Sequence, residues 1–202
     1  MNKLTSTLPN MLLSLTGICI IVAGILAGLN LMTQEPIAQA QVKAKVEAIA
    51  QVTPKFDNNP YEEQFRLLLP GDKDSVTMYP ARMGDEVVGY AIETYTNAGF
   101  SGWISIMVGI DTAARLVDFS VLEISETPGL GSKIDEWFHS PAREGAIQDV
   151  RQIDLSSLAP LKVTKDGGQV DAITAATISS RAFLDAVNRG YEAFKMSRQN
   201  AQ

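Results

Sequence analysis

Small residues and hydroxyls are concentrated in one short segment, Asp171-Ala-Ile-Thr-Ala-Ala-Thr-Ile-Ser-Ser180, directly before an amphipathic stretch that begins at Arg181. The amphipathic spacing predicts a helix, and a helix start presents unpaired N–H groups and the positive end of the helix dipole. These features favour a phosphate group, which the hydroxyl of Thr177 would face from one or two residues before the first turn. The alternative is structural, because Thr177, Ser179 or Ser180 could cap the helix. Capping alone does not explain why so many hydroxyls and alanines occur together.

A second segment, Ser125-Glu-Thr-Pro-Gly-Leu-Gly-Ser-Lys133, precedes the first by about 50 residues. Its proline fixes φ, and Gly129 and Gly131 permit positive φ, so the segment predicts a turn. Glu126 and Thr127 form a polar pair on this glycine-rich loop, and core packing explains such a pair poorly. We therefore expect Glu126 and Thr127 to contact a ligand.

Together, the two segments resemble the FMN-binding domain family found in the G subunit of the Rnf complex and in the C subunit of the sodium-translocating NADH:quinone oxidoreductase. The flavinylation motif of that family is Asp, two residues, Ser or Thr, a small residue, Ala, Thr, any residue, and Ser or Thr. The residues that match it here are Asp171, Thr174, Ala175, Ala176, Thr177 and Ser179. The residues that match the family's Glu-Thr-Pro-Gly-Leu-Gly loop include Glu126, Thr127, Gly129, Leu130 and Gly131.

Two positions depart from the family pattern within the resemblance, which covers roughly residues 87–193. Ala175 stands where glycine is commonest, and alanine adopts positive φ less readily than glycine. Ile124 stands where family members often carry a histidine. If that histidine tunes the flavin in relatives, the tuning is absent or different here.

The resemblance implies that Thr177 carries FMN through a phosphoester bond, attached by a flavin transferase that uses FAD as the donor. It implies an electron-carrier subunit, without a complete active site of its own, in a Rnf-type complex that couples electron transfer between ferredoxin and NAD to ion translocation. Its partners would be the other membrane subunits of that complex. The short chain favours the G subunit of Rnf over the longer C subunit of the quinone reductase.

Further pocket residues are less sharply defined by the sequence. The aromatics of Gly99-Phe-Ser-Gly-Trp103, Trp103 above all, would form either a wall of the flavin pocket or part of the core. Lys133 would either meet the phosphate or be solvated. Asp171 is not expected to touch the phosphate, since like charges repel. It would position the threonine hydroxyl or be recognised by the transferase.

Composition restricts the chemistry that the chain can perform by itself. The net charge is −6 and no basic patch is present, which argues against a nucleic-acid partner. Cys19 is the only cysteine and lies in an apolar run, which excludes an intrachain disulfide and cysteine chemistry in the soluble part. His139 is the only histidine and has no metal-ligand spacing around it. Chemistry beyond acid–base catalysis therefore needs a cofactor.

Residues 11–32 are almost wholly apolar. About 20 residues at 1.5 Å each cross the roughly 30 Å hydrocarbon core, so the run predicts a transmembrane helix. The small residues at Ala38-Gln-Ala40 leave a cleaved signal peptide as the alternative, although apolar regions of signal peptides usually run about 7–15 residues. Lys3 precedes the run and Glu35 follows it. The positive-inside rule then puts the N-terminus in the cytoplasm and the FMN domain on the extracytoplasmic, periplasmic side of the inner membrane.

The expected fold is α+β, with a single transmembrane helix followed by an antiparallel sheet flanked by helices. Helical spacing covers 36–52, 132–138 and 179–195, and strand patterns cover 75–81, 87–94, 102–110 and 116–124. Short connections between consecutive strands predict an antiparallel meander. The expected organisation is a cytoplasmic N-terminus at 1–10, the transmembrane helix at 11–32, a connecting helix and first part of the soluble domain at 33–86, the FMN-binding domain at 87–195, and a tail at 196–202.

Two other functions remain possible at this stage. One is a stand-alone, membrane-anchored flavoprotein reductase that acts on an extracytoplasmic acceptor. The other is a non-redox anchored binding or structural module in which Thr177 is only a helix cap. That module would never contain flavin, and Thr177→Ala would cost it only about 1 kcal/mol of stability.

Overall fold

The computed structural model describes residues 7–72, 74–141 and 146–200. The expectations that involve Lys3, the first six residues and the last two lie outside these residues. The chain divides into two compact units, Met1–Ala44 and Lys45–Gln202. The first contains the apolar stretch, and the second contains the sheet and the predicted flavin motifs.

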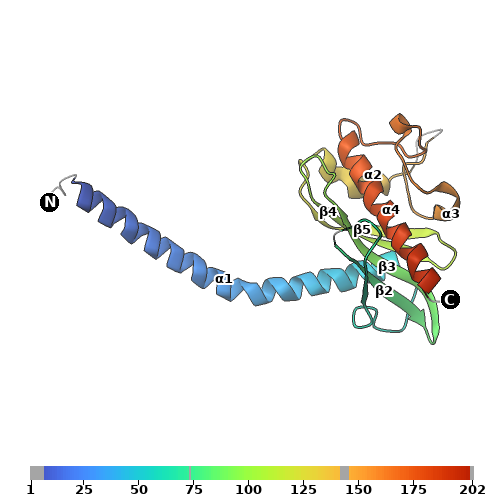
Figure 1. Ribbon diagram of the computed structural model, residues 1–202, viewed down its shortest axis with the longest axis horizontal. Helices are drawn as coiled ribbons and strands as arrows, with labels where there is room; N and C mark the ends of the chain where they lie inside the picture. Colours follow the sequence, from blue (N-terminus) through green and yellow to red (C-terminus); the bar gives the residue numbers. More distant parts are fainter. Residues whose placement is uncertain (1–6, 73, 142–145, 201–202) are drawn as a thin grey trace. The chain divides into compact units, whose positions relative to one another are not determined.

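A single long helix, α1 (Leu8–Val52), covers both the predicted transmembrane span and the helix predicted from residue 36 (Figure 1). Pro36 lies inside this helix. The helix is long and apolar enough to cross a membrane, and its apolar window has no residue buried against the rest of the protein. The exposed leucines and isoleucines of this stretch would be covered by lipid in a membrane.

The second unit contains a five-stranded antiparallel sheet in which each strand pairs with the next along the chain. Its strands are β1 (Phe65–Leu67), β2 (Val76–Met83), β3 (Glu86–Thr96), β4 (Ile104–Asp111) and β5 (Leu116–Ile124). The predicted meander and the α+β class are confirmed. The three-residue β1 was not predicted, because such a short edge strand carries almost no alternation of polar and apolar residues.

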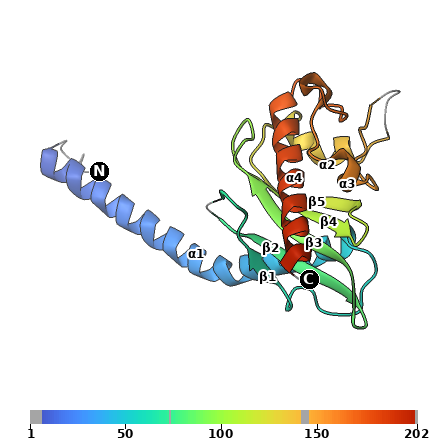
Figure 2. The same ribbon diagram turned by 45° about the vertical axis from the view of Figure 1, so that its right-hand side comes forward.

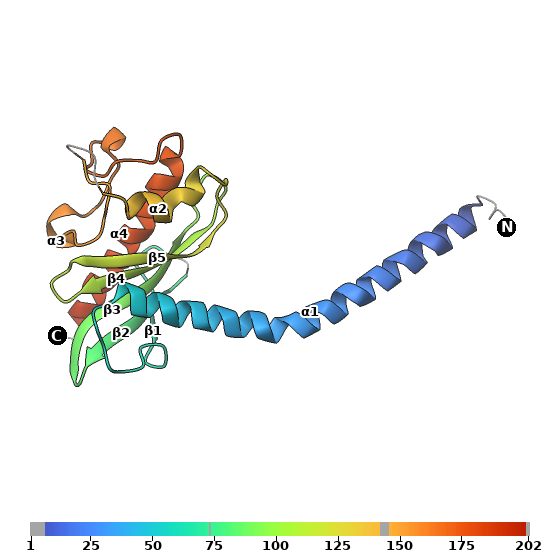
Figure 3. The ribbon, with the colours of Figure 1, turned by 180° about the vertical axis from the view of Figure 1, so that it is seen from behind.

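Both faces of the sheet are covered, which is why seven of the eight residues of β4 are buried. Helix α4 (Thr177–Asn200) lies across one face (Figure 2), and the last turns of α1 lie on the other (Figure 3). Gly109 permits the second contact, since a Cβ there would come within 1.7 Å of the Val52 carbonyl oxygen. The main core therefore lies between the sheet and α4, and a smaller cluster lies under α1.

Helix α4 extends beyond its predicted bounds at both ends. It begins at Thr177 and continues to Asn200. Thr177 is thus the first helical residue, and does not precede the first turn as expected. The apolar residues predicted for its buried face lie in the core, among them Phe183, Ala186 and Val187.

Short helical segments occupy the connections around the start of α4. The predicted helix after the glycine loop is confirmed as a 3₁₀ turn, η1 (Gly131–Lys133), followed by α2 (Ile134–Phe138). Two further elements, α3 (Leu155–Leu158) and the 3₁₀ turn η2 (Thr164–Asp166), were not predicted. These elements have four and three residues, which are too few to show the helical spacing of apolar residues.

Candidate functional site

The turn before α4 has a backbone conformation that explains its small residues. Ala175 has φ of +64°, in the left-handed region that glycine adopts most easily. The next residue, Ala176, is 7% exposed and packs in the core. The turn is held by Ser180, whose Oγ accepts a hydrogen bond from the Ile173 N–H at 3.0 Å and donates one to the Ala176 carbonyl. The chain therefore enters α4 along one defined path.

The three hydroxyls at the start of α4 each have a partner away from the helix amides. Thr177 Oγ1 accepts a hydrogen bond from Lys165 Nζ at 3.2 Å, and Ser179 Oγ donates one to Glu126 Oε2 at 2.9 Å. Among the described residues, none of the three accepts a hydrogen bond from an α4 amide, so the capping arrangement expected as the alternative is not formed. Within the same part of the chain, the amides of Thr177 and Ile178 also have no protein acceptor. They remain available to an anion at the positive end of the helix dipole.

Glu126 joins three segments around the start of α4. Its side chain is 8% exposed, binds Ser179, and lies 3.4 Å from the Ser101 amide. Two glycines make room for this carboxylate. A Cβ at Gly99 would come within 2.4 Å of Glu126 Oε1, and one at Gly131 would come within 2.6 Å of Oε2. The glycine loop, the 99–102 turn and α4 thus meet at one buried carboxylate.

A cavity of about 290 Å³ opens between these segments. Its walls are formed by Phe100, Glu126, Thr127, Leu130, Gly131 and residues 175–179. Three of its side chains are large, apolar and exposed: Phe100 at 69%, Leu130 at 41% and Ile178 at 46%. An apolar rim beside two polar groups and free helix amides is the arrangement expected for a planar ligand with a phosphate.

Lys165 reaches Thr177 because η2 is fastened to the first turns of α4. The guanidinium of Arg181, one helical turn after Thr177, forms two hydrogen bonds of 2.7 Å with the Asp166 carboxylate. These hydrogen bonds lower the pKa of Asp166. Gly167 then ends η2 in a left-handed conformation with φ of +77°. A bidentate pair of this kind fixes orientation as well as distance.

Several predicted residues lie outside the cavity. Gly129, Lys133 and Thr174 line a smaller neighbouring depression together with Trp137. Asp171 contributes backbone groups, since its carbonyl accepts the Trp137 indole N–H at 3.1 Å and its amide binds Ile147. Trp103 stacks on Tyr95, with ring centroids 4.5 Å apart, and is not among the residues that line the cavity.

The sequence indicated the aromatic wall of the cavity only by its segment, and it did not indicate Lys165. Phe100 lines the cavity, whereas Trp103 of the same segment does not. The glycines of that segment did not show which of its aromatic side chains would do so. Lys165 precedes Thr177 by twelve residues in a stretch without a recognised motif, and no signal in the sequence identifies it.

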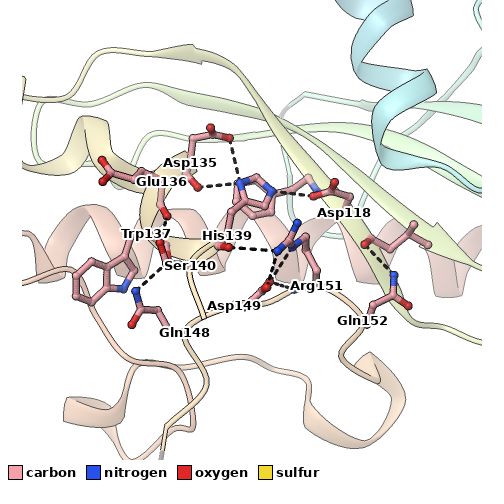
Figure 4. Close-up of polar contacts among 12 residues, drawn as sticks. Asp118, Asp135, Glu136, Trp137, His139, Ser140, Gln148, Asp149, Arg151 and Gln152 are labelled. Carbon is pink, nitrogen blue, oxygen red and sulfur yellow. Dashed lines mark hydrogen bonds and ion pairs between the residues drawn. The ribbon is translucent and has the colours of Figure 1, made fainter. Parts of the chain in front are cut away.

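His139 has structural contacts on every side. Its Nε2 lies 2.8 Å from Asp118 Oδ1 on β5, and its Nδ1 lies 2.8 Å from the Asp135 carbonyl oxygen (Figure 4). Its ring stacks on Phe119, with centroids 4.1 Å apart. These contacts join the end of α2 to the sheet. Among the described residues, no group of three or more His, Cys, Asp or Glu side chains could hold a metal ion.

Arg151 continues this network beside His139 (Figure 4). It donates a hydrogen bond to the His139 carbonyl at 3.2 Å and pairs with Asp149 at 2.7 Å. The hydrogen bonds from Arg151 lower the pKa of the Asp149 carboxyl. The pair therefore helps to attach the 149–151 segment to α2.

The residues around the cavity fit FMN. The apolar rim offers contact to an isoalloxazine ring, and Glu126 and Thr127 offer polar contacts at its edge. The free amides of α4, the Thr177 hydroxyl and the Lys165 ammonium group all suit the phosphate. Gly99 and Gly131 leave room for the Glu126 carboxylate, which lines the cavity, since a Cβ at either position would collide with it.

Comparison with known proteins agrees with this geometry. Residues 99–192 match the sequence model of the FMN-binding domain family. The chain is 32% identical to the G subunit of the ion-translocating oxidoreductase complex of Haemophilus influenzae, over 93% of this chain and 88% of that protein. It is 33% identical to the corresponding protein of Aliivibrio fischeri, over 85% and 82%, and 32% identical to that of Vibrio cholerae, over 87% and 85%. The chain therefore belongs to the family formed by the G subunits of ion-translocating oxidoreductase complexes.

Proposed function

We propose that this protein is the membrane-anchored electron-carrier subunit of a Rnf-type complex, and that it carries FMN bound covalently to Thr177. The observation that carries this proposal is the position of the Thr177 hydroxyl. It lies at the first residue of α4, lines the cavity of Phe100, Glu126 and Leu130, and contacts a lysine. Both the phosphate end and the ring end of FMN have matching protein groups there.

Each part of the site has a separate role in this proposal. The first amides of α4 and the Lys165 ammonium group bind the phosphate, while Phe100, Leu130 and Ile178 contact the ring. Glu126 holds the glycine loop against α4 through Ser179. FMN would supply the redox chemistry. Attachment through the phosphate leaves the ring free to change redox state and prevents loss of the cofactor.

The exposed rim of the cavity supports a role inside a complex. Phe100 is 69% exposed and Ile178 is 46% exposed, so a ring bound between them would lie near the surface, where a neighbouring subunit could exchange electrons with it. We propose that α1 crosses the cytoplasmic membrane with its N-terminus in the cytoplasm and that the FMN domain lies on the extracytoplasmic side. There, a flavin transferase would load the protein with FMN from FAD, and the complex would couple electron transfer between ferredoxin and NAD to ion translocation.

The test is in-gel flavin fluorescence after co-expression of the full chain with a flavin transferase. We expect the wild-type band to remain fluorescent after denaturation and the Thr177→Ala band to be dark. Thr174→Ala is the matched control, because Thr174 is an exposed hydroxyl of the same turn but does not line the main cavity. If fluorescence persists in Thr177→Ala and disappears in Thr174→Ala, the flavin is attached to Thr174 and not to Thr177. A dark wild-type band would contradict covalent attachment.

A further inference from the structure

We propose that the Lys165 ammonium group is the counterion of the phosphodiester on Thr177, and that the Asp166–Arg181 pair holds it there. This inference rests on the proposed function and assigns a residue that lies outside both sequence motifs. It is carried by one contact, the hydrogen bond from Lys165 Nζ to Thr177 Oγ1 at 3.2 Å. In the flavinylated protein this oxygen would be bonded directly to phosphorus. The non-bridging phosphate oxygens would then lie within two bonds of the atom that Nζ already contacts.

The surroundings leave the charge of Lys165 available. Among the described residues, Lys165 forms no ion pair, and its polar partner is the neutral Thr177 hydroxyl. Asp166 is the adjacent carboxylate, but both of its oxygens are occupied by Arg181 at 2.7 Å. Arg181 thus pairs with Asp166, and Lys162 is also near enough to help lower the pKa of that carboxyl. Among the described residues, Lys165 therefore has no carboxylate partner for its positive charge. A phosphodiester carries one negative charge at neutral pH, so the two groups match.

The backbone holds the exposed side chain of Lys165 beside the start of α4. Residues 163 and 170 pair through an isolated bridge, which closes η2 into a tight loop. Gly168 is required at the crossing, since a Cβ there would come within 2.1 Å of the Lys162 carbonyl oxygen. With the loop closed and Asp166 fixed to Arg181, the side chain of Lys165 extends over the first turn of α4. The position is thus a consequence of three separate constraints on one short segment.

Lys133 is the competing candidate, because it follows the glycine loop and is also a lysine near the motif. It lines the depression formed with Gly129, Trp137 and Thr174, and it is not among the residues around Thr177. Within the described residues, no contact between Lys133 and Thr177 is formed. The two lysines therefore make a matched pair for experiment, with the same side chain on two sides of the Thr174–Thr177 turn.

The experiment compares the thermal stability of the full chain with and without attached FMN, obtained by expression with and without the transferase. A lysine with a purely structural role would change the melting temperatures of both forms equally. A counterion stabilises the flavinylated form specifically. We expect Lys165→Met to lower the melting temperature of the flavinylated form by about 1–3 °C more than that of the unmodified form, as an exposed ion pair would. Lys133→Met should affect both forms equally.

Two further measurements sharpen the result. Lys165→Arg keeps the charge and should restore most of the difference. In the wild type, raising the salt concentration should bring the difference in melting temperature between the flavinylated and unmodified forms toward the value for Lys165→Met, because exposed charges are screened. A folded Lys165→Met protein that cannot be loaded, beside a fully loaded Lys133→Met protein, would be a stronger form of the expected result.

The outcomes that would overturn the inference differ from those that affect the function. Equal melting shifts in the two forms of Lys165→Met would refute the counterion role while Thr177 remains flavinylated. A specific shift in Lys133→Met would transfer the role to that lysine. A wild-type protein that takes up no flavin would remove the proposed function, and this inference with it.

Discussion

Replacing Ala175 by glycine should stabilise the unmodified protein, although glycine usually weakens a fold. Ala175 has φ of +64°, where an L-residue brings its Cβ close to the following carbonyl oxygen. Its side chain is exposed, so removing the methyl group sacrifices little burial. The neighbouring Ala176 has no positive φ and is 7% exposed. The same substitution at these two adjacent alanines should therefore have opposite effects.

The magnitude follows from two opposing terms. Relief of the left-handed conformation contributes about 1–2 kcal/mol in favour of glycine. The greater freedom of glycine in the unfolded chain costs about 0.4–1 kcal/mol. Ala175→Gly should therefore raise the free energy of unfolding by about 0.5–1 kcal/mol, or about 1–3 °C in melting temperature. Ala176→Gly loses a buried methyl group, worth about 0.8 kcal/mol, in addition to the entropy cost, so it should destabilise by about 1–2 kcal/mol.

Thermal unfolding of the full chain in detergent, without attached flavin, checks both values. The two tryptophans of the chain, Trp103 and Trp137, both lie in the unit that contains the turn, so their fluorescence reports on that unit. We expect a higher melting temperature for Ala175→Gly and a lower one for Ala176→Gly. If Ala175→Gly melts below wild type by as much as its neighbour, the left-handed conformation does not destabilise the turn and the reasoning is wrong.

Three further predictions concern other parts of the fold. Gly131→Ala would place a Cβ within 2.4 Å of Ser179 Oγ, so we expect a loss of about 1–3 kcal/mol of stability and reduced FMN loading, measured by denaturation and in-gel fluorescence. In Gly109→Ala, the new Cβ would collide with the Val52 carbonyl, so the end of α1 should detach from the sheet. We expect increased proteolysis between residues 45 and 60, and an unchanged digest would contradict this. Asp149→Asn should destabilise the protein at neutral pH, because the pKa of Asp149 is lowered below its ordinary 3.8 by the arginine two residues later. The pKa of Asp149 is lower in the folded than in the unfolded protein, so the ionised carboxylate stabilises the fold above about pH 4 and this stabilisation is lost below it. In acid denaturation, the difference in free energy of unfolding between Asp149→Asn and wild type should therefore become smaller.

The sequence was sufficient for features that depend on local spacing. The length of the apolar run predicted a helix able to cross a membrane, and α1 is such a helix. Strand patterns predicted β2 to β5 within a few residues of their bounds, and the short connections between them predicted the meander. The amphipathic spacing after residue 179 predicted α4. Each of these features depends on residues close together in the chain, so the spacing of polar and apolar residues is enough to predict it.

Features that depend on segments distant in the sequence were not accessible in this way. The contact of Lys165 with Thr177 requires the η2 loop to close and to pair with Arg181. The choice of Phe100 over Trp103 as the wall of the cavity depends on how the 99–102 turn packs against Glu126. Neither relation leaves a periodic pattern, because each joins residues whose separation along the chain is arbitrary.

The sequence by itself determined the composition of the site: a hydroxyl at the start of a helix, a glycine loop with a carboxylate, and a small residue where the backbone must turn. The family motifs named Thr177 and Glu126, and both line the cavity. Only the tertiary structure decided which charge lies beside the hydroxyl, and that Ser179 is bound by Glu126 instead of capping the helix. The reason is physical, since a side chain's partner is selected by the packing of whole segments and not by its neighbours in the chain.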